Sequence, residues 1–353
     1  MAIDIFQNDA YSTVSLTRHI NIMPYVPTRI GDMNLFNDRV DGTDADSRMS
    51  SASQNGIYSD TAVVSSVDGR LMLLPTAGRG TMPTYNQQDK VVQRPFKVPY
   101  IPKNDGIFWD ELIGKAIFGS DLENQQSETV AMATDRKMMK IRKEHYLTWE
   151  YHRLGAIKGV ILDANGTDVV YDLFSEFGVT KKTVTYTTSL AAVSEAIVEH
   201  IGNVLGAESA QGIHCFVGKD FFEKVQAEAE LKEAFARWND GEFLRTSYQA
   251  GMYTGQPVGF TYRGVTYERY RGILSGITPM VADDKAHAFP VGTDRFARYN
   301  APGTVSAAVG TLGLPMYVVS QPKPFDQGVD FHSQSNPLFM CTQPGVLVEI
   351  TVA

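Results

Sequence analysis

The sequence has very little cysteine: Cys215 and Cys341 are the only two in 353 residues. They lie far apart in the chain, so they cannot form a disulfide framework or a zinc module built on cysteine ligands. We expect two buried, unpaired thiols that behave as small apolar side chains in a reducing compartment.

Long apolar runs are missing too. No stretch of about 18 apolar residues occurs, so we expect no membrane-spanning helix. The first residues, MAIDIFQNDAYS, lack the basic segment and the apolar run of a secretory signal peptide. We therefore expect a soluble protein that is intracellular when it is synthesised.

Positive charge is in deficit. The chain has 32 Lys and Arg against 40 Asp and Glu, a formal net charge of −8 and a pI near 5.4. A protein that binds nucleic acid through bulk charge would be basic, so any contact with DNA must come from a local surface. Hydrophobic residues make up 43% of the chain, enough for a sizeable core, and the length suggests about two domains.

The motifs that usually carry catalysis are also missing. We find no P-loop, no glycine-rich dinucleotide motif and no zinc-protease helix motif, and residues 272–276 have the wrong spacing for a nucleophile elbow. His145 and His152 stand about 10 Å apart on a predicted helix, too far to share one metal ion. His214 and Cys215 are neighbours on a predicted strand and point to opposite faces. We therefore predict no catalytic, cofactor-binding or metal-binding residues, and no enzyme.

The first hundred residues do not read as a self-contained unit. Residues 38–60 are polar and rich in Ser, Asp and Gly, and the acidic cluster there lacks the downstream Glu of a calcium loop. Residues 61–67 and 70–74 flank Asp68-Gly69, a dipeptide typical of a two-residue hairpin, and a proline-containing extended segment follows at 91–102. Since an isolated ribbon is marginal in water, we infer that this region borrows its interior from adjoining copies.

Helices and strands alternate in the rest of the chain. Short helices are expected at 107–118 and at 221–238, the second capped by Asp220, and a helix capped by Ser189 should end at Gly206. Turns are expected at Asn165-Gly166 and Arg263-Gly264, and strands at 212–218 and at the C-terminus.

A long helix is predicted at about 128–158. It has two apolar arcs, which predicts neighbours on both sides. Its basic residues either contact nucleic-acid phosphates or form a solvated face, and the solvated face is favoured; they are Arg136, Lys137, Lys140, Arg142, Lys143 and Arg153.

Two stretches resemble the lambda-type (gpE-like) major capsid proteins of tailed bacteriophages. One runs from Arg142-Lys143-Glu144 to Asp163-Ala-Asn-Gly166. The other is the closing segment, with Ala301-Pro302, Gly313-Leu-Pro315, Ser335-Asn336-Pro337-Leu338, Pro344 and Leu347-Val348. Asp68-Gly69 and Arg79-Gly80 fit the hairpin region of that family.

The resemblance implies an α+β chain with the Hong Kong 97-like capsid fold. It implies five segments: an N-terminal arm (1–55), an extended E-loop hairpin (56–104), a peripheral domain with a spine helix (105–185), an axial domain (186–320) and a C-terminal segment returning to the peripheral domain (321–353). A shell protein of an encapsulin-like nanocompartment is the alternative within this fold, and a soluble hydrolase using scattered acidic residues is the alternative outside it.

The resemblance also implies partners. Copies of the chain would form pentamers and hexamers of an icosahedral head, assembled in the host cytoplasm and enclosing double-stranded DNA through non-specific contacts. No helical prodomain precedes the arm, so we expect a separate scaffolding protein, together with a portal and a decoration protein. Lys90 and Lys97 are present, but we predict no crosslink between subunits.

Overall fold

The computed structural model describes residues 12–37, 55–67, 91–112, 130–187, 189–206, 208, 210–228, 258–274 and 278–352. Internal contacts divide the chain into two compact units. Unit 1 is formed by 1–64, 94–152 and 297–339, and unit 2 by 65–93, 153–296 and 340–353. Each unit is described by itself.

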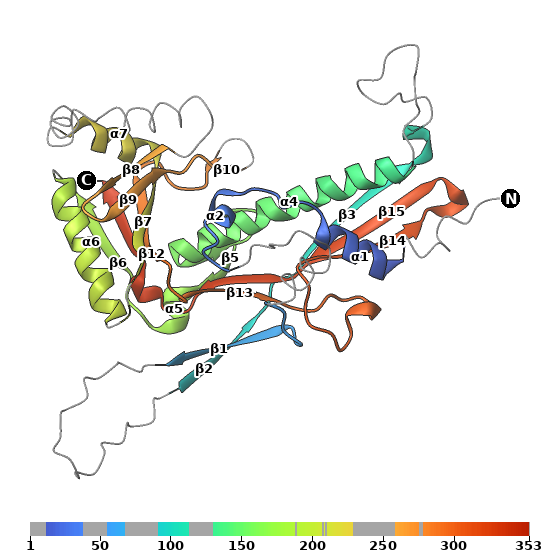
Figure 1. Ribbon diagram of the computed structural model, residues 1–353, viewed down its shortest axis with the longest axis horizontal. Coiled ribbons are helices and arrows are strands. Elements are labelled where there is room, and N and C mark those ends of the chain that lie inside the picture. The colour runs from blue at the N-terminus through green and yellow to red at the C-terminus, as the bar shows by residue number, and fades with distance from the viewer. Residues whose placement is uncertain are drawn as a thin grey trace, which may run out of the picture. The chain divides into compact units, whose positions relative to one another are not determined.

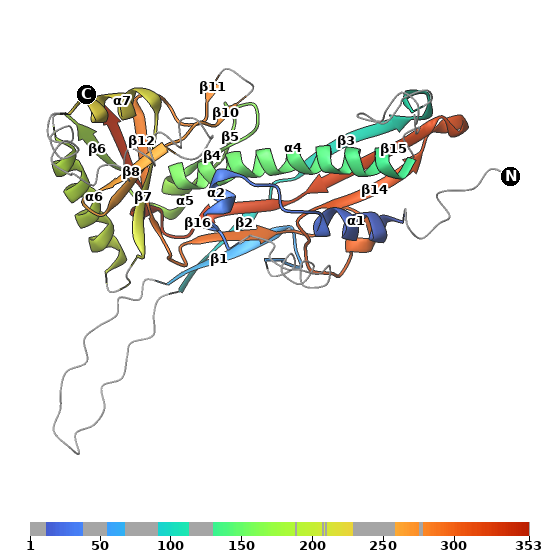
Figure 2. The same ribbon diagram turned by 45° about the horizontal axis from the view of Figure 1, so that its top comes forward.

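Unit 1 is built on a three-stranded antiparallel sheet with a long helix beside it. The sheet has the order β14 (Tyr317–Pro322), β15 (Gly328–Ser335), β3 (Ile101–Phe108). Helix α4 (Val130–Lys158) runs along β3 and β15 in both views (Figures 1 and 2). Helix α1 (Thr13–Ile22) lies against β14, and α2 (Arg29–Asp32) follows it. Short 3₁₀ turns lie at Trp109–Glu111, Ser306–Ala308 and Pro324–Asp326.

The N-terminal residues 12–37 are packed into the core of unit 1. Leu16, Ile20, Ile30 and Phe36 are buried, and the Thr17 hydroxyl exchanges hydrogen bonds with the backbone of Val318 in β14. The inference that the first hundred residues depend on adjoining copies for an interior is therefore wrong for this segment. It failed because its apolar side chains pack on strands some 300 positions later, which local composition does not reveal.

Unit 2 contains a six-stranded mixed sheet. Its order is β6 (Lys182–Tyr186), β17 (Val348–Val352), β12 (Lys285–Val291), β7 (Gly212–Val217), β9 (Val265–Arg269), β8 (Val258–Tyr262). The β6–β17 and β7–β9 pairs are parallel and the other pairs are antiparallel. The helices are α5 (Leu173–Phe177), α6 (Leu190–Leu205) and α7 (Lys219–Ala227).

Four smaller strand pairs complete the described residues. They are β1 (Thr61–Val67) with β2 (Val91–Lys97), β4 (Val160–Leu162) with β5 (Val169–Asp172), β10 (Ile273–Leu274) with β11 (Thr278–Pro279), and β13 (Phe296–Asn300) with β16 (Pro337–Cys341). A last 3₁₀ turn lies at Pro344–Val346.

Several local predictions are confirmed because the signal is contained in the turn itself. The Asn165-Gly166 turn joins β4 to β5, with Gly166 at φ +77°. Arg263 and Gly264 join β8 to β9, both at positive φ. Helix α6 ends at Gly206, which has φ +66°, and the C-terminal strand is β17. The long helix is within two residues of its expected bounds.

Three other predictions are wrong, and in the first two a partner distant in sequence replaces the local interaction. Residues 107–108 end strand β3, paired with β15, and 109–111 form a 3₁₀ turn instead of a helix. Ser189 precedes α6 but makes no side-chain cap; the Leu190 N–H donates to the carboxylate of Glu228 instead. Asp220 lies in the first turn of α7, which Gly218 caps.

The predicted hairpin at Asp68-Gly69 falls partly outside the described residues, as do 113–118 and 229–238. Strand β1 pairs with β2, so the proline-containing segment is a strand at 91–97. The edge position expected for proline is confirmed at Pro102, since β3 lies at the edge of its sheet.

Candidate functional site

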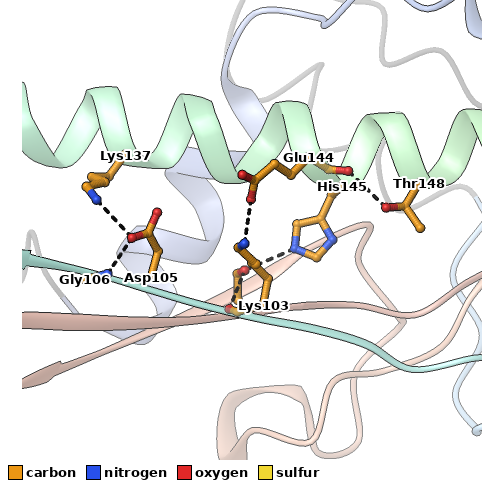
Figure 3. A network of polar contacts seen from close by, with 8 residues as sticks. Lys103, Asp105, Gly106, Lys137, Glu144, His145 and Thr148 are labelled. Atoms are coloured by element: carbon orange, nitrogen blue, oxygen red, sulfur yellow. Dashed lines mark hydrogen bonds and ion pairs between the residues drawn. The ribbon is translucent and has the colours of Figure 1, made fainter. Parts of the chain in front are cut away.

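Helix α4 carries a network of polar contacts with the neighbouring strands (Figure 3). Its two predicted apolar arcs are covered, as expected: Met138, His145, Trp149 and Tyr146 are buried. Leu147 is the exception, 55% exposed. Two of its buried side chains, His145 and Trp149, meet strand β15 of the sheet.

A single directed chain of hydrogen bonds joins α4 to both strands. The Nε1 of Trp149 donates to Ser335 Oγ at 3.2 Å. Ser335 Oγ lies 2.9 Å from His145 Nδ1, and His145 Nε2 lies 3.1 Å from Ser333 Oγ. Ser333 Oγ then donates to the carbonyl of Lys103 at 2.9 Å.

The two hydroxyl protons decide the state of the histidine. Ser333 uses its one proton on Lys103, so it must accept from His145, and the imidazole carries its proton on Nε2. Nδ1 is then an acceptor, and it receives the proton of Ser335, whose oxygen accepts from Trp149. Each of these groups has a partner of the right kind only when His145 is neutral.

Burial reinforces this neutral state. It lowers the pKa of His145 to about 4, and the nearby positive charge of Lys103 acts in the same direction. A second proton, on Nδ1, would meet the hydroxyl proton of Ser335, which would then have to leave its acceptor. This network of His145, Trp149, Ser333 and Ser335, called the lock below, therefore holds helix and strand together at neutral pH. It is not arranged as an acid–base centre.

The spacing of helix and strand makes this lock specific for one register. His145 and Trp149 are four residues apart, a rise of about 6 Å on a helix. Ser333 and Ser335 are two residues apart and share a face of β15, a distance of about 6.8 Å. A slip of one residue would turn both serines away from α4, so the network fixes the strand against the helix.

Two ion pairs lie along the same contact, between α4 and strand β3. Lys137 Nζ contacts Asp105 Oδ1 at 3.0 Å with both side chains mostly buried, and Lys103 contacts Glu144 at 3.2 Å with both about 40% exposed. Burial alone would raise the pKa of Asp105, but hydrogen bonds from Lys137 and the Gly106 N–H outweigh it and lower that pKa. The exposed Lys103 pair contributes little to stability.

Two arginines that the sequence placed among the basic residues of α4 are buried. In unit 1 Arg142 donates to the carbonyl of Ile20 and to Tyr146 Oη, and in unit 2 Arg153 is 1% exposed. The six basic residues therefore form neither a single solvated face nor a single phosphate-contacting one. Arg136, Lys140 and Lys143 are the exposed members.

Other buried charges in unit 1 hold the same core. Arg298 lies over the rings of Trp149 and Phe339, 4.5 and 5.4 Å from their centroids. Glu150 accepts from the backbone N–H of Ile30 in α2. These residues were not found from the sequence, because nothing local marks a buried charge.

Unit 2 has a separate cluster of charged side chains around Glu349, near the β6 edge of its six-stranded sheet. Glu349 of β17 pairs with Lys181 and, at 3.1 Å, with Lys285 of β12. Lys158 donates to the carbonyl of Met280. Burial lowers the pKa of Lys158 to about 8, against the opposing attraction of Glu349.

The two cysteines and His214, considered as candidate functional residues from the sequence, are buried in unit 2. Cys215 and Cys341 are buried and unpaired, as predicted, and burial raises the pKa of both. His214 does not face Cys215 but pairs with Glu268 at 2.9 Å.

No described group of His, Cys, Asp and Glu side chains could hold a metal ion. None of the helices in the described ranges is long and apolar enough to cross a membrane. The acidic cluster of residues 38–60 (Asp41, Asp44 and Asp46), Lys90, and Ser275 of the 272–276 stretch lie outside the described residues, so the structure places none of them.

Comparison with known proteins identifies the family. A family model described as phage major capsid protein E matches residues 12–352. The chain belongs to this family. It is a major capsid protein of a phage, and as such part of the virion.

A curated relative agrees with this assignment. It is the major capsid protein of Salmonella phage Felix O1 (isolate Felix O1-VT1), 28% identical over 297 residues that cover 74% of this chain and 78% of that protein. The resemblance to the capsid-protein family seen in the sequence is confirmed by the family match, and the helices and sheets of the structure agree with the predicted α+β class. A nanocompartment shell is the less supported interpretation.

Similar solved structures share little sequence with this capsid protein. One is a phage-related protein from Bordetella bronchiseptica RB50, with a TM-score of 0.48, 8% identity and 95% of both chains covered. Another is the satellite phage P4 procapsid including the size determination protein, with a TM-score of 0.47, 10% identity, and 99% and 97% covered. The family assignment rests on the sequence matches.

Proposed function

We propose that copies of this chain assemble into the pentamers and hexamers of an icosahedral head that encloses double-stranded DNA. The observation that carries the proposal is the capsid-family match over residues 12–352. The role is structural, and we expect no catalytic activity. Negative-stain microscopy and sedimentation of the purified protein test it: closed particles are expected, and a small oligomer under every assembly condition would contradict it.

The five segments predicted from the sequence supply the proposed division of labour. Residues 56–104 would extend over a neighbouring subunit, α4 would be the spine of the peripheral domain (105–185), and residues 186–320 would face the capsomer centre. The lock between α4 and β15 supports the proposal of a rigid spine helix, because a subunit must present its interfaces in one fixed geometry.

The hairpin region offers a sharp deletion test. Ala62, Val64 and Phe96 are buried, so removing all of 61–100 would damage the fold. Replacing 68–90 with a short Gly-Ser linker keeps β1 and β2. We expect a folded, soluble protein that no longer forms closed particles.

The matched control for this deletion replaces 68–90 with a Gly-Ser segment of the same length. Comparing the two variants separates the effect of losing the side chains of 68–90 from the effect of shortening this segment. Normal shells from the shortened protein would refute the role of this segment in assembly.

The proposed shell function implies further partners. We expect a separate scaffolding protein, a portal and a decoration protein, with assembly in the host cytoplasm. The shell would contact the packaged DNA without sequence specificity. The exposed basic side chains of α4 are candidates for contact with its phosphates. Co-expression with and without a candidate scaffolding protein, scored by particle yield, tests the first of these. A boiled denaturing gel without a ladder of multimers is expected, since we predict no crosslink.

A further inference from the structure

Three lysines of unit 2 meet at one carboxylate. Lys181 and Lys285 both form ion pairs with Glu349, Lys285 at 3.1 Å. Lys158, the last residue of α4, is close enough for its charge to interact with all three of these residues. We call Lys158, Lys181, Lys285 and Glu349 the Glu349 cluster. With its amines protonated, the cluster has three positive charges and one negative charge.

The sheet and the end of α4 set the positions of these side chains. Strand β17 lies between β6 and β12, so Lys181, which precedes β6, and Lys285, which begins β12, reach Glu349 from opposite sides. Lys181 Nζ is 6.0 Å from the centroid of the Phe174 ring, and the same ring packs against Gly159, directly after α4. The backbone of the sheet and of α4 therefore brings the amines together.

The surroundings of the cluster leave its positive charge in excess. Burial lowers the pKa of Lys158 to about 8, against the attraction of Glu349, and the charges of the other two lysines add to the fall. His287 is the cross-strand neighbour of Glu349 and shares its face of the sheet. Burial and the charge of Lys158 lower the pKa of His287 to about 3, so this imidazole is neutral at pH 7. The net charge of the site is therefore set by the lysines and Glu349.

The two ion-paired lysines have donors to spare. Lys181 contacts Oε2 of Glu349 and Lys285 contacts Oε1, whereas each ammonium group has three N–H donors. The side chains of Lys181 and Lys285 are 37% and 39% exposed, and that of Glu349 is 9% exposed. An anion in solution can therefore reach the amines, while the carboxylate that would repel it is mostly covered.

Phosphate has the chemistry that matches this arrangement. It offers several acceptor oxygens and about two negative charges at neutral pH, and the ammonium group of lysine binds it as a point charge. A phosphate dianion would bring the net charge of the cluster from +2 to zero. We propose that the Glu349 cluster is a phosphate-binding site in which Lys181 and Lys285 donate to the phosphate oxygens. Free phosphate and the backbone of nucleic acid are two sources of this group, and the test distinguishes them.

Inorganic phosphate is the first probe, titrated into the unassembled protein at pH 7 and constant ionic strength in a calorimeter. Lys285→Gln should raise the dissociation constant about tenfold or more, because one charge-assisted hydrogen bond is lost. Lys181→Gln gives an independent variant with the same expected effect. Glu349→Gln should lower the dissociation constant, because the repelling carboxylate is removed. General damage to the fold would not produce these opposite effects.

The matched control is Lys182→Gln. Lys182 is exposed and lies opposite Val348 in the ladder between β6 and β17, so its side chain points to the other face of the sheet from Glu349. This variant loses the same charge one residue away from Lys181. It should bind phosphate as the wild-type protein does.

A short DNA duplex is the second probe. Weaker binding of both probes to Lys285→Gln would assign the site to a phosphate of nucleic acid, and weaker binding of phosphate alone would assign it to the free ion; both results support the site. It would be overturned by phosphate giving no more heat than chloride at the same ionic strength, by an equal loss in Lys182→Gln, or by weaker binding in Glu349→Gln. Particle formation is not measured here, so the result is independent of the proposed shell function.

Discussion

Replacing His145 with glutamine isolates the contribution of the buried lock in unit 1. A glutamine amide can still donate to Ser333 Oγ, and its oxygen can accept from Ser335. Unlike the imidazole, it cannot take up a proton in the experimental range. The substitution is therefore expected to keep the fold while removing one titrating group.

The expected size of the effect follows from the pKa of about 4, against 6.5 for an ordinary histidine. Between these values the folded chain binds fewer protons than the unfolded chain, so its stability falls as the pH falls. The contribution is fully present above pH 6.5 and is lost toward pH 4. It amounts to about 3 kcal/mol in total, of which about 2 kcal/mol disappears between pH 7 and pH 5.

Urea unfolding of the unassembled protein at pH 7, 6 and 5 measures this slope. His145→Gln should be somewhat less stable than wild type at pH 7, because ring packing is lost, but its stability should fall less on acidification. His287 provides an independent arm in unit 2: burial, with the charge of Lys158, lowers its pKa to about 3. His287→Gln should also flatten the profile, and the double variant should flatten it further.

The outcome that contradicts the lock is a His145→Gln profile parallel to that of wild type from pH 7 to pH 5. Parallel profiles would mean that His145 titrates in the folded protein with the same pKa as in the unfolded chain. The proton assignments deduced from Ser333 and Ser335 would then be wrong.

Two further predictions concern unit 2. Burial holds the pKa of Lys158 at about 8, below the ordinary 10.5, so wild-type stability should rise by about 2 kcal/mol from pH 7.5 to pH 9.5, and Lys158→Met should lose that rise in thermal melts. An identical slope would refute the buried position of the amine. Gly159→Ala should destabilise by about 2–4 kcal/mol, since φ is +80° and a Cβ would stand 2.2 Å from the Phe174 ring. Its control, Gly178→Ala, has φ +66° with open space around it and should cost only about 1 kcal/mol; equal costs would contradict the steric argument.

The sequence predicts best the features whose cause is local. Asn165-Gly166 and Arg263-Gly264 specify their turns because few residues accept positive φ. The long helix, 29 residues in the structure, is predicted because apolar residues between Met139 and Ile157 recur at the helical period. The same reasoning fails at 107–108, where an apolar run compatible with a helix instead pairs with β15.

The lock in unit 1 left only a partial signal. His145 and Trp149 stand at helical spacing, and Ser333 and Ser335 at strand spacing, but nothing in the sequence says that these two segments meet. Arg142 illustrates the same limit: a basic residue among five others reads as surface charge until a carbonyl 122 positions away is found beside it. Long-range pairing is the information that composition and periodicity lack.

The lock also bears on assembly. Every donor in it has an acceptor within the chain, and a one-residue slip of β15 would break several hydrogen bonds at once. A subunit must present its interfaces in one fixed geometry, so loosening this register should weaken assembly. Ser335→Ala leaves Trp149 Nε1 and His145 Nδ1 without a hydrogen-bond partner and should raise the concentration at which particles form, measured by sedimentation. An unchanged particle-forming concentration would contradict the link between the register of β15 and assembly.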